Sequence, residues 1–387
     1  MKSIIIHITC SDFGKRSTIG YRSYKIYENL LCEKDNIFVI ARRNKSQSKK
    51  IITTYPVFLL SRIFNLISTY FISSFPARNL EILLFNFYII PYIIYLRFKF
   101  RTTKRIIHLW DTSIWFTKFI KKLGFEILLD ISMTPCFASI IEATKNPKYY
   151  QDKVSTLNQV KKEKKIMKMA KRCICPSVFT GEFIKNNYGI DKSKIIVIPF
   201  GADPIISKNK HIRDDAKVIK LGYVGLINKR KGIRWLIDVL NLIQKDNTKI
   251  KFELNLYGRI FKDELYFINN AKFKIKTHGF IRNNKNIFPK FDILVHPSFI
   301  EGSAKSIYEA ISFGLPVICT KQSGSICKHS YNGFIVDAGD SKKLYIYLIK
   351  LLSNKSLIKK MGKKSKILSE NFTWEIYASK VHQLYLK

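Results

Sequence analysis

Short apolar runs alternate with helical patterns along the first half of the chain. The polar loop Ser11–Gly20 follows the first run, and Tyr21–Cys32 has a helical pattern. The apolar runs are three to five residues long and lack a helical period, which is typical of strands. They are Ile4–Ile8, Ile37–Ala41, Ile106–Leu109, Ile127–Leu129, Cys173–Cys175 and Ile195–Ile198. Strands separated by helices favour parallel pairing in an α/β sheet.

A second alternation begins after a polar stretch, Ile206–Ala216, which has the composition of a linker. Helical patterns occupy Ile233–Ile243, Leu344–Leu352 and Trp374–Leu386. The strand patterns are Leu221–Val224, Phe252–Leu256, Ile275–His278, Ile293–His296, Val317–Thr320 and Phe334–Val336. A chain of 387 residues is too long for one ordinary core and suits two domains of about 180 residues each.

The stretch from residue 293 to residue 340 carries the clearest chemistry. After its first strand, a loop of small and charged residues contains Glu301, and Ser306 with Glu309 three positions later predicts a capping box that opens a helix. Gly314 ends that helix before the next strand. A helix start favours a phosphate or diphosphate, and Glu309 could accept two hydrogen bonds from a vicinal diol such as a ribose. The alternative is an ordinary structural cap.

The whole pattern resembles the donor site of retaining glycosyltransferases of the GT-B fold, family 4. In that family two glutamates separated by seven residues hold the nucleotide sugar, and here they fall on Glu301 and Glu309. The resemblance implies two Rossmann-like domains that face each other across a cleft. Residues 1–205 would bind the acceptor, residues 206–370 the nucleotide sugar, and a helix in residues 371–387 would pack back on the first domain. The resemblance is weak from Gln47 to Lys104.

The same resemblance assigns the rest of the donor site. In the loop LGYVGLINKRKG, Lys231 would meet the diphosphate, whereas Leu226 stands where the family often has an arginine. Arg230 could supply that charge; a lysine-rich surface loop is the alternative. Further donor-binding positions are the turn residues Gly258, Gly279 and Phe280, and Gly302, Ala304, Lys305 and Ser306 at the helix start. Cys327 falls in the segment after Gly324 where the family has an acidic residue.

The acceptor side is assigned from residues at strand ends in the first domain. Gly14 follows the first strand and would allow close approach of a ligand. His108, Asp111 and Asp130 are expected to point into the cleft, with Asp130 as a catalytic candidate beside Glu301, Lys231 and Arg230. Many relatives have a histidine where Asp130 stands, and capping of the following helix is the alternative role for this aspartate.

The charge of the chain indicates a polyanionic partner. There are 68 Lys and Arg residues against 28 Asp and Glu, a formal net charge of +40, which favours nucleic acid or an anionic membrane surface. The most apolar stretch, Ile82–Leu96, has a basic flank, and its length and central proline predict that it falls short of a spanning helix. It is either a buried helix or a membrane-surface element. No recognised nucleic-acid motif appears, so the membrane is favoured.

Other classes of site lack a signature. The seven cysteines form no CxxC pair, which predicts buried free thiols in a reducing cytoplasm. No Asp-x-Asp triplet and no histidine cluster is present, so neither a metal nor another cofactor is expected. The absence of G-x-G-x-x-G after the first strand disfavours a dinucleotide-dependent dehydrogenase.

The sequence therefore predicts a retaining glycosyltransferase at the cytoplasmic face of the plasma membrane. Its substrates would be a nucleoside diphosphate sugar and a lipid-linked or cell-surface polysaccharide intermediate, as in lipopolysaccharide assembly. A non-catalytic nucleotide-sugar binder and a basic nucleic-acid-binding protein on the same scaffold are the alternatives.

Overall fold

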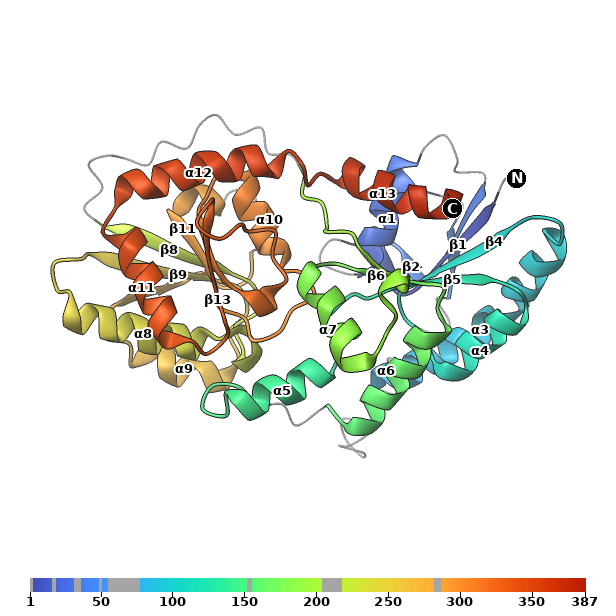
Figure 1. Cartoon of the computed structure of the whole chain (residues 1–387), viewed down its shortest axis with the longest axis horizontal. Coiled ribbons are helices and arrows are strands. Elements are labelled where there is room, and N and C mark those ends of the chain that lie inside the picture. The colour runs from blue at the N-terminus through green and yellow to red at the C-terminus, as the bar shows by residue number, and fades with distance from the viewer. Residues whose placement is uncertain are drawn as a thin grey trace.

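The protein consists of two lobes, each built on a parallel β-sheet flanked by helices (Figure 1). The predicted linker, Ile206–Ala216, lies outside the part of the chain described by the computed structural model, and so does the predicted boundary after residue 205. The described residues are 3–15, 19–30, 36–48, 51–54, 77–151, 155–203, 218–281 and 287–387.

The first lobe has a seven-stranded sheet in the order β3-β2-β1-β4-β5-β6-β7. Its strands are β1 (Ile4–Phe13), β2 (Ile37–Asn44), β3 (Ile51–Thr53), β4 (Arg105–Leu109), β5 (Glu126–Asp130), β6 (Arg172–Cys175) and β7 (Ile195–Val197). Its helices are α1 (Ile19–Asn29), α3 (Ala77–Lys99), α4 (Ile114–Lys122), α5 (Phe137–Lys145), α6 (Leu157–Met169) and α7 (Val178–Tyr188). The Ile- and Val-rich runs form these strands because β-branched side chains suit a sheet that is buried on both faces.

The second lobe has a six-stranded sheet in the order β10-β9-β8-β11-β12-β13. Its strands are β8 (Ile219–Val224), β9 (Phe252–Tyr257), β10 (Lys274–Thr277), β11 (Ile293–His296), β12 (Val317–Thr320) and β13 (Gly333–Val336). Its helices are α8 (Ile233–Asp246), α9 (Lys262–Asn269), α10 (Lys305–Ser312), α11 (Ser341–Leu352) and α12 (Lys355–Ser369). Every strand predicted from the apolar runs is present within two residues of its expected bounds, apart from the longer β1 and β2.

The last helix, α13 (Trp374–Leu386), returns to the first lobe and lies beside α1 (Figure 1). Tyr377, Val381 and Tyr385 are buried on α13 and pack in the same core cluster as Ile5 and Val39 of the first sheet. Close to its start, the backbone pairs Ala202 with Thr373, at the point where the chain crosses between the lobes. The predicted crossing of the C-terminal helix back to the first domain is confirmed.

Two elements of the first lobe differ from the sequence prediction. β1 continues through Ser11–Phe13, which was expected to be loop, because Asp12 pairs with Arg42 at 2.9 Å and with Arg43 on the neighbouring strand β2. These arginines allow a carboxylate to be buried at a strand end. The short edge strand β3 was not predicted.

The helix α3 is longer than predicted, and Pro91 lies within it. Leu80–Lys99 is long and apolar enough to cross a membrane by length and composition, so the prediction that this stretch falls short of a spanning helix is wrong: the helix continues through Pro91. Its side chains at helical spacing, Phe85, Ile89, Ile93 and Leu96, are buried in the core of the first lobe. One face of the helix is therefore a core face, as one alternative predicted, and the opposite face carries exposed side chains.

Of the cysteines in the described residues, Cys10, Cys173, Cys175, Cys319 and Cys327 are buried free thiols, as predicted, whereas Cys136 is half-buried.

Candidate active site

Arg230 and Lys231 come from a short 3-10 turn, Lys229–Lys231, between β8 and α8. The next residue, Gly232, has φ +70°, and a Cβ there would lie 2.0 Å from the carbonyl oxygen of Pro297. Only glycine permits this close packing of the turn on the loop that follows β11. The amide of Phe299 donates to the carbonyl of Arg230 at 2.9 Å, so the two cations are fixed over Glu301.

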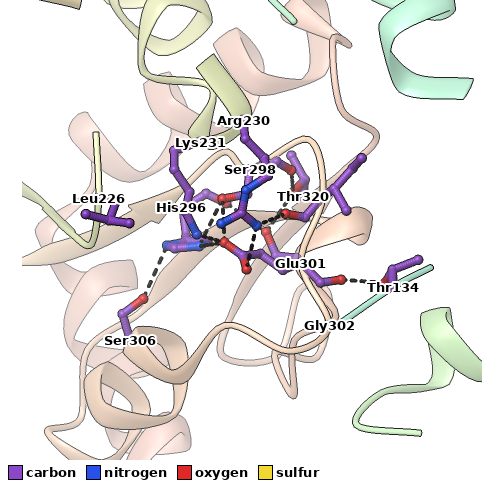
Figure 2. Close-up of polar contacts among 12 residues, drawn as sticks. Thr134, Leu226, Arg230, Lys231, His296, Ser298, Glu301, Gly302, Ser306 and Thr320 are labelled. Atoms are coloured by element: carbon purple, nitrogen blue, oxygen red, sulfur yellow. Dashed lines mark hydrogen bonds and ion pairs between the residues drawn. The ribbon is translucent and has the colours of Figure 1, made fainter. Parts of the chain in front are cut away.

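Figure 2 shows Arg230 and Lys231 converging on the Glu301 carboxylate. The Lys231 ammonium contacts Oε1, and the Arg230 guanidinium lies 3.1 Å from Oε2 while donating to the carbonyl of Ile300 at 2.8 Å. The Lys231 and Glu301 side chains are only 10% and 11% exposed. The alternative of a surface loop is therefore wrong for Lys231, whereas the Arg230 side chain is 25% exposed and pairs with the same carboxylate. Leu226 lies apart from the cluster and is 45% exposed (Figure 2).

Two residues that the sequence did not single out complete the cluster. His296 ends β11, and its Nε2 lies 3.8 Å from Glu301 Oε1 and 3.1 Å from the hydroxyl of Ser298. Burial, together with the Lys231 and Arg230 charges, holds the pKa of His296 well below its ordinary value, so the ring is neutral at pH 7. Its position at the carboxyl end of a parallel strand was the available signal.

Burial and the neighbouring Arg230 also lower the pKa of Lys231. The Glu301 carboxylate favours the charged ammonium, because an opposite charge in contact offsets the cost of desolvation. The site therefore presents two cations and one carboxylate in a confined, mostly buried space.

The helix α10 begins at Lys305 beside this cluster, two residues before the start that Ser306 as N-cap residue predicts. The capping-box prediction is wrong: Ala304 is the N-cap residue without a side-chain bond, and the Ser306 hydroxyl lies 3.3 Å from His296 Nδ1 instead. Because Ser306 already lies within the first turn, its hydroxyl points to β11. Glu309 pairs with Lys305 at 3.1 Å. Lys305 is the first residue of the helix whose start was predicted to meet a diphosphate, and Glu309 lies one turn further along it.

The two glycine turns predicted to bind the donor, at Gly258 and Gly279, are adjacent at the ends of β9 and β10. The amide of Gly258 donates to the carbonyl of Gly279 at 2.8 Å, and a Cβ on Gly258 would lie 1.8 Å from the carbonyl oxygen of Gly225. Phe280 follows and is 76% exposed. The turns at Gly225, Gly258 and Gly279 therefore lie side by side, backbone against backbone.

A cavity of about 360 Å³ lies in the first lobe at the carboxyl ends of β4 and β5. Its wall combines apolar side chains with carboxylates, and includes Ile82, Trp110, Asp111, Asp130, Met133, Thr134 and Glu163. The Thr134 hydroxyl donates to the backbone carbonyl of Glu301 at 2.5 Å, so the cavity adjoins the donor-side cluster. Asp111 and Asp130 thus lie where the acceptor was expected.

His108 does not line this cavity, contrary to the prediction that it points into the cleft. It is fully buried, its Nδ1 lies 2.7 Å from the Tyr385 hydroxyl on α13, and its Nε2 lies 3.4 Å from Asp130. Asp130 also pairs with Arg22 at 2.7 Å and does not cap the next helix, whose N-cap residue is Cys136. Burial opposes the charge of Asp130, but Arg22 and His108 outweigh it and lower the pKa of the carboxyl. Gly14 follows β1 with φ +81°, packed against Ser46.

Comparison with known proteins identifies the second lobe. Residues 219–354 match the family model of glycosyl transferases group 1. This part of the chain is similar to the group 1 glycosyl transferases. It contains the Arg230–Lys231 turn, Glu301 and Glu309, so the cluster lies within the region that matches the family model.

Two curated relatives each match about half of this chain. The chain is 27% identical over 213 residues to the capsular polysaccharide biosynthesis glycosyltransferase CapM of Staphylococcus aureus, covering 50% of this chain and 56% of CapM. It is 27% identical over 211 residues to an Escherichia coli UDP-Gal:alpha-D-GlcNAc-diphosphoundecaprenol alpha-1,3-galactosyltransferase, covering 49% of this chain and 53% of that protein. The chain thus spans just over half the length of these curated relatives.

Among solved structures, the lipopolysaccharide outer core galactosyltransferase WaaB superposes with a TM-score of 0.69 at 16% identity, covering 100% of this chain and 99% of WaaB. The chain has the GT-B fold, as the sequence resemblance implied.

Proposed function

We propose that the chain is a retaining glycosyltransferase that moves a sugar from a nucleoside diphosphate sugar to an acceptor hydroxyl. The observation that supports this best is the position of Glu301, in contact with Lys231 and Arg230 beside the start of α10. Two cations and a helix N-terminus suit a diphosphate, and a carboxylate next to them suits the hydroxyls of the attached sugar.

Each residue then has a distinct task. Lys231, Arg230 and the start of α10 stabilise the charge that develops on the departing diphosphate. Glu301 positions the sugar and Glu309 the ribose. The bond between the anomeric carbon and the phosphate oxygen breaks as the bond to the acceptor oxygen forms on the same face, and the departing phosphate oxygen takes the acceptor proton. No metal or other cofactor takes part in this proposal.

The cavity beside Thr134 is the place for the acceptor. It opens at the carboxyl ends of β4 and β5, and it is lined by apolar side chains and by Asp111. Carboxylates accept hydrogen bonds from sugar hydroxyls, and apolar walls pack on the faces of a sugar ring. An acceptor hydroxyl in this cavity would lie near Glu301, because the Thr134 hydroxyl touches both the cavity and the Glu301 backbone.

A lipid-linked acceptor at the cytoplasmic membrane face fits the helix α3. Ile82 near its start lines the cavity, and further along the same helix Phe87, Tyr95 and Phe98 are 54%, 56% and 72% exposed. Arg97 and Lys99 follow at its basic end. Apolar side chains flanked by cations are typical of a membrane-surface helix. The name of the E. coli relative includes a diphosphoundecaprenol acceptor, and that of CapM capsular polysaccharide biosynthesis.

Calorimetric titration with UDP, GDP and ADP tests the donor site. We expect one of the three to bind preferentially, and Glu309→Ala to weaken it about tenfold, since the lost bonds to a ribose are worth about 1.4 kcal/mol. The exposed helix glutamate Glu375 provides the control variant Glu375→Ala, which should bind like the wild type. Binding of none of the three, with steeply salt-dependent binding of single-stranded DNA instead, would contradict the proposal and favour the nucleic-acid alternative.

A further inference from the structure

Three buried hydroxyl groups of the first lobe reach the loop that carries Glu301. Thr134 donates to the carbonyl of Glu301 at 2.5 Å, and Ser177 donates to the carbonyl of Gly302 at 2.8 Å. Thr180 lies 3.3 Å from the same Gly302 carbonyl and 3.0 Å from each of the other two hydroxyls. None of the three is more than 4% exposed. We call these residues, Thr134, Ser177 and Thr180, the hydroxyl cluster.

Each hydroxyl of the cluster has an acceptor for its one proton. The Thr134 hydroxyl donates to the carbonyl of Glu301, and the Ser177 and Thr180 hydroxyls donate to the carbonyl of Gly302. The amide of Thr180 also donates to Ser177 Oγ at 3.2 Å, which fixes the Ser177 side chain at the start of α7. Buried hydroxyls with complete partners have defined orientations, so this contact is rigid.

Glycine is required on the opposite side of the contact. A Cβ on Gly302 would lie 2.5 Å from the carbonyl oxygen of Ser132, and a Cβ on Gly324 would lie 2.1 Å from the carbonyl oxygen of Gly302. The Glu301–Gly302 peptide is therefore enclosed between the loop after β5 and the turn at Gly324. Both lobes therefore hold this peptide: the amide of Glu301 donates to the carbonyl of Gln322 in the second lobe at 3.0 Å, and the hydroxyl cluster of the first lobe binds the two carbonyls.

We propose that the hydroxyl cluster positions the carboxylate of Glu301 for the transferred sugar. This inference rests on the proposed function, because it assumes that Glu301 contacts the sugar. Thr134 also lines the acceptor cavity, so one residue joins that cavity to the loop of the donor-side glutamate. The position of Glu301 then depends on contact between the lobes, through the hydrogen bonds from Thr134 to the carbonyl of Glu301 and from Ser177 and Thr180 to the carbonyl of Gly302.

The variant Thr134→Val tests the inference because it removes one hydroxyl and keeps the side-chain volume. Thr117→Val is the matched control: Thr117 is fully buried in the first lobe, and its hydroxyl bonds within that lobe, to the carbonyl of Ser113 at 2.8 Å and the hydroxyl of Thr112 at 2.9 Å. We expect amide hydrogen exchange of residues 299–304 to be about tenfold faster in Thr134→Val than in the wild type or in Thr117→Val. Thr134→Ser should restore protection.

Titrations with UDP and with UDP-galactose supply the second readout. Thr134→Val should change UDP affinity by less than twofold but weaken UDP-galactose about tenfold, since only the sugar contacts Glu301. The inference would be overturned by equal rates of amide hydrogen exchange in Thr134→Val and Thr117→Val. It would also be overturned if Thr134→Val weakened the binding of UDP and of UDP-galactose by the same factor. If the wild type binds neither nucleotide, this donor assignment fails, and the exchange measurement alone decides whether the hydroxyls hold the loop.

Discussion

At the scale of single residues, Glu301 shows how a buried charge becomes acceptable. A carboxylate that is 11% exposed needs partners, and Lys231, Arg230 and Ser298 supply them. Arg230 contacts Glu301 next to Lys231. Leu226, where the family often has an arginine, lies apart from this cluster and is 45% exposed. The second cation of the site thus comes from a different place in the same loop.

Lys231→Met should weaken binding of the preferred nucleoside diphosphate by about tenfold to a hundredfold, because a bond to a charged group is worth about 1.5–3 kcal/mol. Lys229→Met is the matched control in the same turn: Lys229 is 37% exposed and pairs with Asp263 at 3.7 Å. Such a surface pair contributes under about 1 kcal/mol. Calorimetric titration measures both, and equal losses in the two variants would show that only the net charge of the loop matters.

At the scale of one element, α3 has a buried face that packs in the core and an exposed face that carries aromatic side chains. Its buried residues recur at helical spacing and pack on the first sheet, and Asn86 on the same helix donates to Ser113 at 3.0 Å. The exposed face carries aromatic side chains next to a basic end. The buried-helix alternative is therefore confirmed for one face of α3, and contact of the exposed face with a membrane stays a prediction.

Binding to vesicles of anionic phospholipid at low salt tests the exposed face. We expect the double variant Tyr95→Ser/Phe98→Ser to bind at least tenfold more weakly than the wild type, because each inserted aromatic side chain contributes about 1.5–3 kcal/mol. Tyr266 on α9, which is 70% exposed, provides the control variant Tyr266→Ser. Unchanged vesicle binding in the double variant would leave general positive charge as the cause of membrane attraction.

At the scale of the whole molecule, a buried polar network ties α13 to the first sheet. The ring nitrogens of His7 lie 3.0 Å from Ser23 and 3.0 Å from Tyr385, which also contacts His108. Burial, and for His7 the neighbouring His108, lowers the pKa of both rings. These histidines are therefore neutral in the folded protein at pH 7.

Stability should fall as the pH drops below 6.5. The unfolded chain then takes up protons that the folded chain refuses, at a cost of about 1.4 kcal/mol per pH unit for each such histidine. His7, His108 and His296 act in this direction, whereas Glu142, whose pKa is raised by burial, opposes it. Urea unfolding at pH 7.5, 6.5 and 5.5 measures the slope.

Single variants separate the contribution of the buried rings. His7→Gln should reduce that slope by about 1.4 kcal/mol per pH unit. A slope that is the same in His7→Gln and in the wild type would exclude His7 as a source of the pH dependence.

The sequence by itself determined the strands, the two-lobed α/β fold and the residues that meet at Glu301, namely Lys231 and Arg230. Apolar periodicity, glycine turns and helix ends are local properties, so they are visible without the fold. It misjudged Ser306 as a cap and missed β3, because the first turn of α10 and a three-residue edge strand depend on neighbouring elements.

Only the tertiary structure decided how distant residues share one site. Thr134 and Glu301 are 167 positions apart, and His108 and Tyr385 are 277 apart. No local pattern encodes such pairs. Packing within one lobe buries His108 under the last helix and brings Arg230 to Glu301. Packing of the first lobe on the second brings the three hydroxyls to the glutamate loop. Hydrogen bonds and ion pairs form only where packing brings their partners together.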